Sequence, residues 1–391
     1  MDLSNLSDSI SKSMESLTRP ALSEINLRDP YGKVNRLIIV GNGFDLAHGL
    51  KSSFSDFLNA YCNDILRDIV FNQEYDSPLI QVISREPFRD SEEFDSKFKR
   101  INGMADLNLM MNRRGIGAKW KSDFFKSLLQ QIEIKKWVDI EIVFFDFLKK
   151  LSNPGHPDGI SKLNVELDFL KKKLKEYLII EVKGIEFEAH HQIHEQFTRI
   201  IDKDDCKTNT IKESKPADAI CVLNFNYSDL VWRYFESFNK STWQHIPIHG
   251  QLSGDDITSQ GPVFGFGDEL DKDYLEFEHQ RNDAVFEHIK SFKYLQFNHY
   301  RNLLEFIESE PYQVQIFGHS CGVSDRTLLN TIFENENCIS VKPFYHAWEG
   351  GDDYEQKSFA ISRHFKSKAE LRAKVVNKQY CEPMSQPKKE E

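Results

Sequence analysis

The stretch Leu37-Ile-Ile-Val-Gly-Asn-Gly-Phe-Asp-Leu-Ala-His-Gly-Leu50 decides the fold of this chain of 391 residues. It begins with a short apolar run that stops at Gly41. An uninterrupted apolar run of this kind is typical of a strand whose two faces are both buried, as in a parallel sheet. A glycine-containing turn and a helical pattern follow. The stretch therefore predicts the strand–turn–helix unit from which α/β proteins are built.

Short apolar runs of the same kind return after residue 215, at residues 219–225, 245–249, 263–266, 314–318 and 339–344. Helical patterns lie between them, at residues 230–238, 283–308 and 326–334. Ser324 is the expected N-cap of the last helix. Because strands alternate with helices, we predict an α/β fold with a Rossmann-like, mostly parallel sheet and flanking helices.

The pattern between residues 63 and 214 is different, because apolar residues there recur at helical spacing. We predict that this segment is a large α-helical insert, which divides the core into residues 32–62 and 215–350. Residues 1–31 form a polar N-terminal extension, and residues 351–391 form a C-terminal segment. The end of that segment, residues 377–391, is rich in Pro, Lys and Glu and is predicted to be disordered.

Composition excludes several classes of protein. The chain has 50 Lys and Arg against 61 Asp and Glu, a net charge of −11, so it is not a general nucleic-acid binder. No apolar run approaches the roughly 20 residues that span a bilayer, and the first residues lack the apolar centre of a signal peptide. The six cysteines form no CxxC pair. We therefore expect a cytoplasmic protein with reduced thiols and no membrane partner.

The first candidate site is the turn Gly41-Asn42-Gly43, with Phe44 and Asp45 behind it. A glycine turn between a strand and a helix lets the backbone approach a phosphate closely. The dinucleotide fingerprint requires a third glycine where this chain has Leu46. The motif alone therefore leaves two interpretations open, a nucleotide-binding turn and a tight turn that needs two glycines.

Two further candidates follow apolar strands. Asn226 and Tyr227 lie in Asn224-Phe-Asn-Tyr-Ser-Asp229, where Asn226 could orient a hydroxyl group or a water, or could cap the next helix. His249, followed by Gly250, is a candidate general base, since the pKa of histidine is about 6.5. A histidine at a strand end can equally have a structural role.

The fourth candidate is Gly318-His-Ser-Cys-Gly322, which is followed by Asp325. It joins a strand to a helix and could form a second turn that faces a phosphate or a ribose. It also resembles the Gly-x-Ser-x-Gly elbow of serine hydrolases, although only Asp325 or Asp352 and His346 or His364 could complete a triad. We favour the first interpretation.

Isolated ionisable residues are less specific signals. Glu141 falls within an apolar helical stripe, which indicates either a place near the site or a structural ion pair. His190 and His194 share a helix face at i and i+4, but no third ligand and no HExxH pattern accompany them. We interpret them as part of a polar helix face and predict no metal.

The motifs and their order resemble the AbiH family of phage abortive-infection proteins. The resemblance rests on residues 37–50 with Ser55-Asp-Phe57, and it continues through Trp137-Val-Asp-Ile-Glu141, residues 224–229, Ile248-His-Gly250 and residues 318–325. The family is in turn distantly similar to the sirtuin-like fold of bacterial NAD-hydrolysing defence proteins. No CxxC pair corresponds to the zinc ribbon of deacetylating sirtuins. The resemblance therefore implies NAD binding or hydrolysis and not deacetylation.

This resemblance also implies residue roles. Asn226 would orient the ribose or a water, and His249 with Gly250 would supply the catalytic base. NAD would be held by two turns, formed by Gly41, Asn42, Gly43, Phe44 and Asp45 and by Gly318, His319, Ser320 and Asp325.

The function implied is abortive-infection defence in which the protein binds and hydrolyses NAD or a related nucleotide and releases nicotinamide. One alternative is a nucleotide-sensing or interaction protein without enzymatic activity. A nuclease or toxin has less support, because an acidic chain offers no basic track. A phage component or a partner protein is the expected trigger, and the sequence leaves a homo-oligomer open.

Overall fold

The computed structural model of the protein describes residues 32–84, 103–111, 116–135, 139–152, 158–236, 242–252, 262–269, 271–280 and 282–386. The N-terminal extension expected at residues 1–31 and the last five residues of the chain lie outside these ranges.

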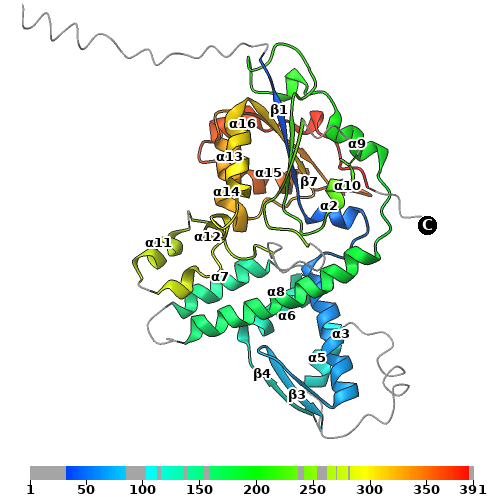
Figure 1. The fold of residues 1–391 in the computed structure, drawn as a ribbon, viewed down its shortest axis with the longest axis vertical. Coiled ribbons are helices and arrows are strands. Elements are labelled where there is room, and N and C mark those ends of the chain that lie inside the picture. The colour runs from blue at the N-terminus through cyan, green and yellow to red at the C-terminus, as the bar shows by residue number, and fades with distance from the viewer. Residues whose placement is uncertain are drawn as a thin grey trace, which may run out of the picture.

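A five-stranded parallel sheet forms the centre of the core (Figure 1). Its strands are β1 (Asn35–Val40), β5 (Ile220–Asn224), β6 (Trp243–Pro247), β7 (Tyr312–Phe317) and β8 (Cys338–Phe344). They lie side by side in the order β6-β5-β1-β7-β8. In chain order this is 3-2-1-4-5, the arrangement of dinucleotide-binding Rossmann folds. The prediction of a Rossmann-like parallel sheet is confirmed.

The central strand β1 is buried along its whole length. Leu37 and Ile39 pack into one apolar cluster, whereas Ile38 and Val40 pack into another, because successive side chains of a strand point to opposite faces. The uninterrupted apolar run of β1 therefore follows from burial on both faces.

Helices cover both faces of the sheet (Figure 1). The first cluster is completed by α13 (His299–Ser309), α14 (Arg326–Glu334) and α15 (Tyr354–Ser362), with α16 (Lys368–Lys374) beside them. The second is completed by α2 (Asn42–Ala47), α9 (His191–Thr198) and α10 (Leu230–Arg233). The helix α14 begins where the sequence predicts, but its N-cap is Asp325, because Ser324 lies within the short 3-10 helix η4 (Val323–Asp325).

The insert has its own large apolar cluster and lies below the sheet in Figure 1. The helices that contribute to this cluster are α3 (Phe54–Asn72), which begins before residue 63, and α5 (Gly103–Met111), α6 (Asp123–Lys135), α7 (Ile140–Leu151) and α8 (Gly159–Gly184). The helix α9 also lies within residues 63–214 but packs on the sheet. The insert also contains an antiparallel sheet of β2 (Glu74–Asp76), β3 (Ile80–Ser84) and β4 (Ile116–Trp120). The insert is mainly helical, as the sequence predicts. The sequence pattern does not indicate its three strands, since strands this short show little alternation of apolar and polar residues.

The segment between β6 and β7 also differs from the sequence prediction. Residues 263–266 form one isolated bridge, between Phe266 and Ile289, and no strand. The helix expected at residues 283–308 is divided into the 3-10 helix η3 (Asp283–Phe286), α12 (Lys290–Tyr294) and α13. A helix α11 (Lys272–His279) precedes them. A Cβ atom at Gly265 would lie 1.9 Å from the carbonyl oxygen of His288, so the two backbones touch where the long helix was expected.

The C-terminal segment packs on the core as far as Gln386. It contains a hairpin of β9 (Ala347–Trp348) and β10 (Gly351–Asp352), and the 3-10 helix η5 (Lys378–Tyr380). Pro383 bridges to Tyr345, and the side chain of Met384 is buried in the cluster that contains Phe344. The prediction of disorder is therefore wrong for residues 377–386. Burial of the apolar side chain of Met384 beside β8 stabilises this segment on the core.

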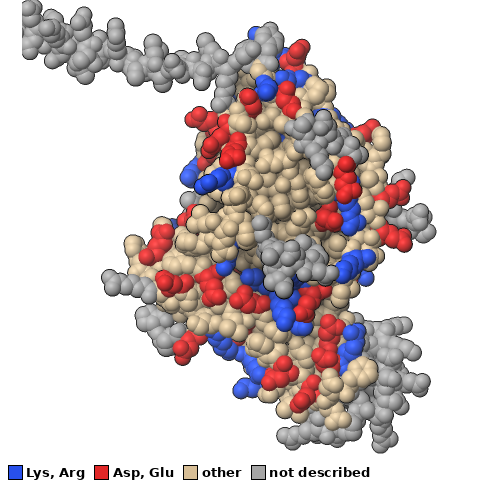
Figure 2. All heavy atoms as spheres, in the orientation of Figure 1, with Lys and Arg blue, Asp and Glu red and all other residues tan. Residues whose placement is uncertain are grey.

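Acidic and basic side chains are interspersed on the face that Figure 2 shows. In the described part of the chain, no helix combines the length and the apolar character needed to cross a membrane.

Candidate active-site cleft

A cavity of about 330 Å³ lies where the strand order of the sheet reverses. The central strand β1 has β5 as its neighbour on one side and β7 on the other, so the strand order reverses at β1. Ligands of open α/β sheets bind beyond the carboxyl ends of the strands at such a point. Residues that follow β1, β5, β6 and β7 line the cavity, namely Gly41, Asn226, His249 and Gly318. The insert closes it with Leu174, Leu178 and Val182 of α8. Its volume is within the range of small-molecule sites, about 300–1,000 Å³.

The structure brings most of the predicted site residues into this one cavity. The predicted residues that line it are Gly41, Asn42, Gly43, Asp45, Glu141, Asn226, Tyr227, His249, Gly318, His319, Ser320 and Asp325. Phe44 and Gly250 do not line it. The ring of Phe44 is buried among aromatic side chains on the sheet face, 6.0 Å from the ring of Phe197.

The glycines allow two turns to touch. A Cβ atom at Gly41 would lie 2.5 Å from the Cα atom of His319, and one at Gly318 would lie 2.1 Å from the backbone nitrogen of Phe44. The N–H of Gly43 donates to the carbonyl oxygen of Gly318 at 2.8 Å. These contacts support the tight-turn interpretation. Phosphate binding at these turns stays a prediction.

Asn226 is fixed at the edge of the cavity. Its side-chain amide donates to the carbonyl oxygen of Gly41 at 3.1 Å, and its backbone N–H donates to Asn224 Oδ1 at 3.0 Å. The N-cap of α10 is Asp229, so Asn226 does not cap this helix. The hydroxyl group of Tyr227 donates to the carbonyl oxygen of Val263 at 3.3 Å.

Asp45 is a buried carboxyl group with an unused oxygen. Ser228 Oγ donates to Asp45 Oδ2 at 2.7 Å, whereas Asp45 Oδ1 has no hydrogen-bond partner among the described residues. Burial raises the pKa of Asp45 to about 7. A carboxyl group with this pKa can donate or accept a proton near neutral pH.

A fully buried lysine, Lys290, joins two acidic residues of the cavity. Its Nζ atom lies 2.7 Å from Glu141 Oε2 and 2.7 Å from Asp325 Oδ1. The other oxygen of Glu141 accepts the N–H of Gly265 at 3.0 Å. Glu141 therefore satisfies both interpretations of its sequence pattern, since it is ion-paired and lines the cavity. Burial raises the pKa of Glu141 to about 7, although the positive charge of Lys290 acts to lower it.

Two histidines face the same aspartate. His249 Nε2 lies 3.3 Å from Asp325 Oδ1, and His319 Nε2 lies 3.7 Å from Asp325 Oδ2. Burial and the charge of Lys290 lower the pKa of His249, and burial lowers the pKa of His319 to about 3. Burial opposes ionisation of Asp325, but Lys290 and the histidines hold its pKa well below the usual range. Both histidines are therefore neutral at pH 7 beside an ionised carboxylate.

No hydrolase triad forms at Ser320 among the described residues. His364 Nε2 contacts the carbonyl oxygen of Cys321 at 2.8 Å, and His346 Nδ1 contacts the side chain of Gln386 at 3.1 Å. No hydrogen bond joins either histidine to Ser320 in the described part of the chain. The hydrolase alternative therefore has no structural support.

Sequence reasoning missed several polar residues of the site. Lys290 lies in a stretch where it is one lysine among several, and no motif or spacing indicates it. Tyr294, whose hydroxyl group lies 3.3 Å from His249 Nε2, comes from the same stretch. Asp139 is the N-cap of α7, lines the cavity and accepts the N–H groups of Glu141 and Ile142. An aspartate just before a helical stripe is a cap signal that could have found it.

The fold and the cleft define a Rossmann-like α/β protein with a cavity at the strand-order reversal that is closed by an insert. A family model described as bacteriophage abortive infection AbiH matches residues 37–346, from β1 to just beyond β8, so the chain belongs to the AbiH family. A search of curated proteins finds no match.

Proposed function

We propose that the cleft binds NAD and cleaves its nicotinamide–ribose bond, and that this reaction serves the phage abortive-infection role that the AbiH family indicates. The proposal rests on one observation above all, the excess of carboxyl groups over cations in a buried cleft. Four acidic residues line the cavity, namely Asp45, Asp139, Glu141 and Asp325. Two of them, Glu141 and Asp325, pair with the buried ammonium group of Lys290.

The acidic lining fits the chemistry of glycosidic cleavage. When nicotinamide leaves, positive charge develops at C1′ of the ribose, and fixed carboxylates in a site of low dielectric constant stabilise it. The C1′–N bond breaks with its electron pair on the nicotinamide nitrogen, and water adds to C1′. The proton that this water loses needs a base. ADP-ribose, nicotinamide and one proton are the products.

The residues of the cleft would share this work. Asn226, held by Gly41, would orient a ribose hydroxyl group or the water. His249 is neutral and would accept the proton, and Asp325 at 3.3 Å would stabilise the imidazolium that forms. Asp45 has an unused oxygen and a pKa near neutrality, which suits it to bond a ribose hydroxyl group or to hold the proton instead.

The test is nicotinamide release from NAD, measured by chromatography with purified protein and with lysates of phage-infected cells. Wild-type protein should release nicotinamide, and Asn226→Ala and His249→Gln should each lower the rate about 100-fold or more. His245→Gln is the matched control, because His245 lies in β6, four residues before His249, and does not line the cavity. The proposal fails if no condition yields nicotinamide, or if His249→Gln is as active as His245→Gln.

One observation favours a nucleotide sensor without enzymatic activity. The candidate catalytic side chains already bond to other protein groups, Asn226 to Gly41 and His249 to Asp325. Such a cleft could bind a nucleotide without transforming it. Calorimetry separates the two functions, since a sensor would bind NAD with a stoichiometry of about one and release no nicotinamide.

A further inference from the structure

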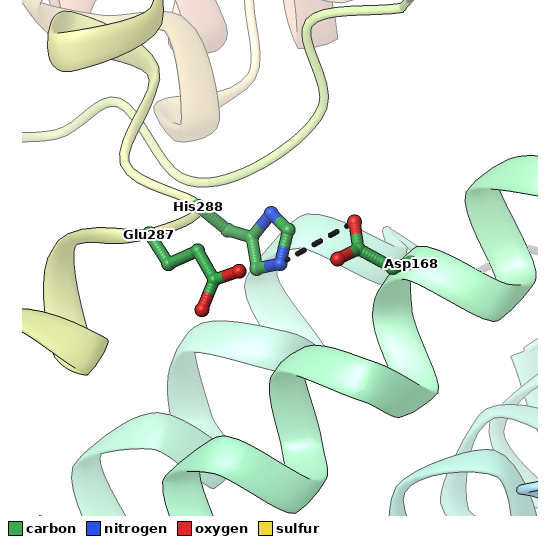
Figure 3. Close-up of side chains that lie close together, drawn as sticks. All are labelled: Asp168, Glu287 and His288. Atoms are coloured by element: carbon green, nitrogen blue, oxygen red, sulfur yellow. Dashed lines mark ion pairs between the residues drawn. The ribbon is translucent and has the colours of Figure 1, made fainter.

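A second cluster of ionisable side chains lies outside the cleft, where the insert meets the segment that leads into α12. Asp168 comes from α8, and Glu287 and His288 follow η3. One ligand atom from each of the three lies within 4.8 Å of the others. Figure 3 shows the imidazole of His288 between the two carboxylates. Because Asp168 is far in sequence from Glu287 and His288, no spacing pattern could reveal the three together.

His288 needs an explanation of its own. Its side chain is 2% exposed, and neither ring nitrogen has a hydrogen-bond partner among the described residues. The Nε2 atom lies 3.6 Å from Asp168 Oδ1, too far for a hydrogen bond. A buried polar group without a partner costs about 1–3 kcal/mol. Edge-on packing against Phe144, with ring centroids 5.6 Å apart, holds the imidazole in this place.

The two carboxylates are accessible and only partly engaged. Asp168 is 52% exposed, and its Oδ1 atom also pairs with Lys171 Nζ at 3.3 Å. Glu287 accepts the side-chain amide of Asn164 through Oε2 at 2.6 Å, and no bond to Oε1 is seen in the described part of the chain. The side chain of Lys171 is long and partly exposed, so its ammonium group could move away from Asp168 when a cation binds.

We propose that Asp168, Glu287 and His288 bind a divalent transition-metal ion, of which Zn²⁺ is the best match. Imidazole with carboxylates is a ligand set for Zn²⁺ and its neighbours, whereas Mg²⁺ and Ca²⁺ prefer oxygen ligands alone. Lys171 and Lys293 are the positive charges that face His288. These two ammonium groups repel a bound cation. A cation that forms a strong bond to the imidazole nitrogen, as Zn²⁺ does, is therefore favoured over one that is held by charge alone.

The site would join two parts of the chain. Asp168 belongs to the insert, and His288 lies two positions before Lys290, the buried lysine of the cleft. An ion bound here would hold the segment that carries Lys290 against α8. The site does not depend on NAD chemistry, so its test is independent of the proposed function.

The test is Zn²⁺ binding by the full-length protein after treatment with a chelator, measured by competition with a chromogenic zinc indicator and by the shift in melting temperature. Wild-type protein should bind one Zn²⁺ per chain, and Zn²⁺ should raise its melting temperature. Asp168→Asn should weaken binding about tenfold or more and abolish the shift. Because Asp168 is half exposed, this variant should fold normally.

Asp146→Asn is a closely matched control. Asp146 is also 52% exposed, and it pairs with a lysine three positions on, at 3.1 Å. This variant should bind Zn²⁺ as the wild type does. The proposal is overturned if the wild type shows no saturable binding, or if Asp168→Asn and Asp146→Asn bind Zn²⁺ equally, as they would if surface thiols were the ligands.

Discussion

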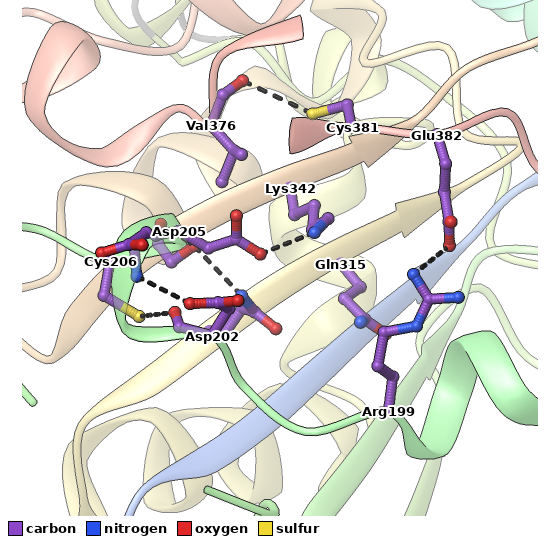
Figure 4. Close-up of polar contacts among 12 residues, drawn as sticks. Arg199, Asp202, Asp205, Cys206, Gln315, Lys342, Val376, Cys381 and Glu382 are labelled. Carbon is purple, nitrogen blue, oxygen red and sulfur yellow. Dashed lines mark hydrogen bonds and ion pairs between the residues drawn. The ribbon is translucent and has the colours of Figure 1, made fainter. Parts of the chain in front are cut away.

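Two buried lysines of this protein make ion pairs in different surroundings. Lys290 is fully buried between Glu141 and Asp325, and both carboxylates line the cleft. Lys342 of β8 pairs with Asp205 alone, at 2.6 Å (Figure 4). Neither member of this second pair lines the cleft. Buried charge is common to both places, so it does not by itself identify a functional site.

The two lysines differ in the charged groups that surround them. The pair of Lys342 and Asp205 is one positive and one negative charge, and Ser340 donates to the backbone carbonyl oxygen of Asp205 at 2.7 Å. The cluster around Lys290 has more acidic groups than basic ones and opens on a cavity. Burial raises the pKa values of Asp45 and Glu141 to about 7, and carboxyl groups with strongly perturbed pKa values in a cavity are candidates for a functional site. This difference leads us to propose that the functional site is the cavity lined by Glu141 and Asp325, and not the surroundings of Lys342.

Replacing each lysine by methionine should give the largest contrast. Lys290→Met leaves two buried carboxylates without their cation and should cost about 3–5 kcal/mol of unfolding free energy. Lys342→Met leaves only one carboxylate, that of Asp205, without its cation and should cost less, about 1–3 kcal/mol. Urea unfolding at pH 7 measures both. Equal losses of unfolding free energy in the two variants would mean that Lys290 and Lys342 stabilise the fold to the same extent. The surroundings of Lys290 would then not differ energetically from those of Lys342.

The pH dependence of stability tests the unpaired carboxyl group of the cleft. Burial raises the pKa of Asp45 from 3.8 to about 7 in the folded protein. Between these values the folded state binds more protons than the unfolded state, so the ionisation of Asp45 lowers stability as the pH rises. The stability of Asp45→Asn relative to wild type should therefore increase from about pH 4 to about pH 7 and then level off.

The control for this experiment is Asp146→Asn, in which an exposed carboxylate outside the cleft is replaced. Its stability relative to wild type should change little over the same range. If the Asp45→Asn difference is equally flat, the carboxyl group of Asp45 is not perturbed by burial, and its role in proton transfer loses support.

Glycine substitutions give a smaller contrast. Gly318 and Gly350 both have left-handed backbone conformations, with φ values of 65° and 87°. Conformation alone should cost about 1–2 kcal/mol for alanine at either position. A Cβ atom at Gly318 would also meet the backbone of Phe44, whereas one at Gly350 would meet nothing within 4 Å. Gly318→Ala should therefore lower the melting temperature more than Gly350→Ala. Equal effects would mean that the contact between the two turns is loose.

The sequence predicts the parallel sheet well, because a strand that is buried on both faces has an uninterrupted apolar run, as from Leu37 to Val40. It also predicts most of the cleft, because the ends of parallel strands meet at one edge, which brings Gly41, Asn226 and Gly318 together. It does not predict Lys290, since a buried charge has no periodicity and its partners Glu141 and Asp325 are distant in sequence.

Other features could not be predicted for related reasons. The strands β2, β3 and β4 are too short to show alternation, and their pairing depends on the apolar cluster of the insert. The packing of Met384 beside β8 depends on one apolar side chain in a polar segment. In each case tertiary contacts, and not local propensity, decide the structure.

The central claim is that the cleft at the strand-order reversal is the ligand site, and hydrogen–deuterium exchange of the wild-type protein with and without ADP-ribose tests it most directly. ADP-ribose is the expected product, so binding needs no turnover. The account predicts slower exchange in peptides that cover residues 41–50, 224–229 and 318–325, and unchanged exchange in β2 to β4. Protection that leaves these three segments unaffected and appears elsewhere would contradict it.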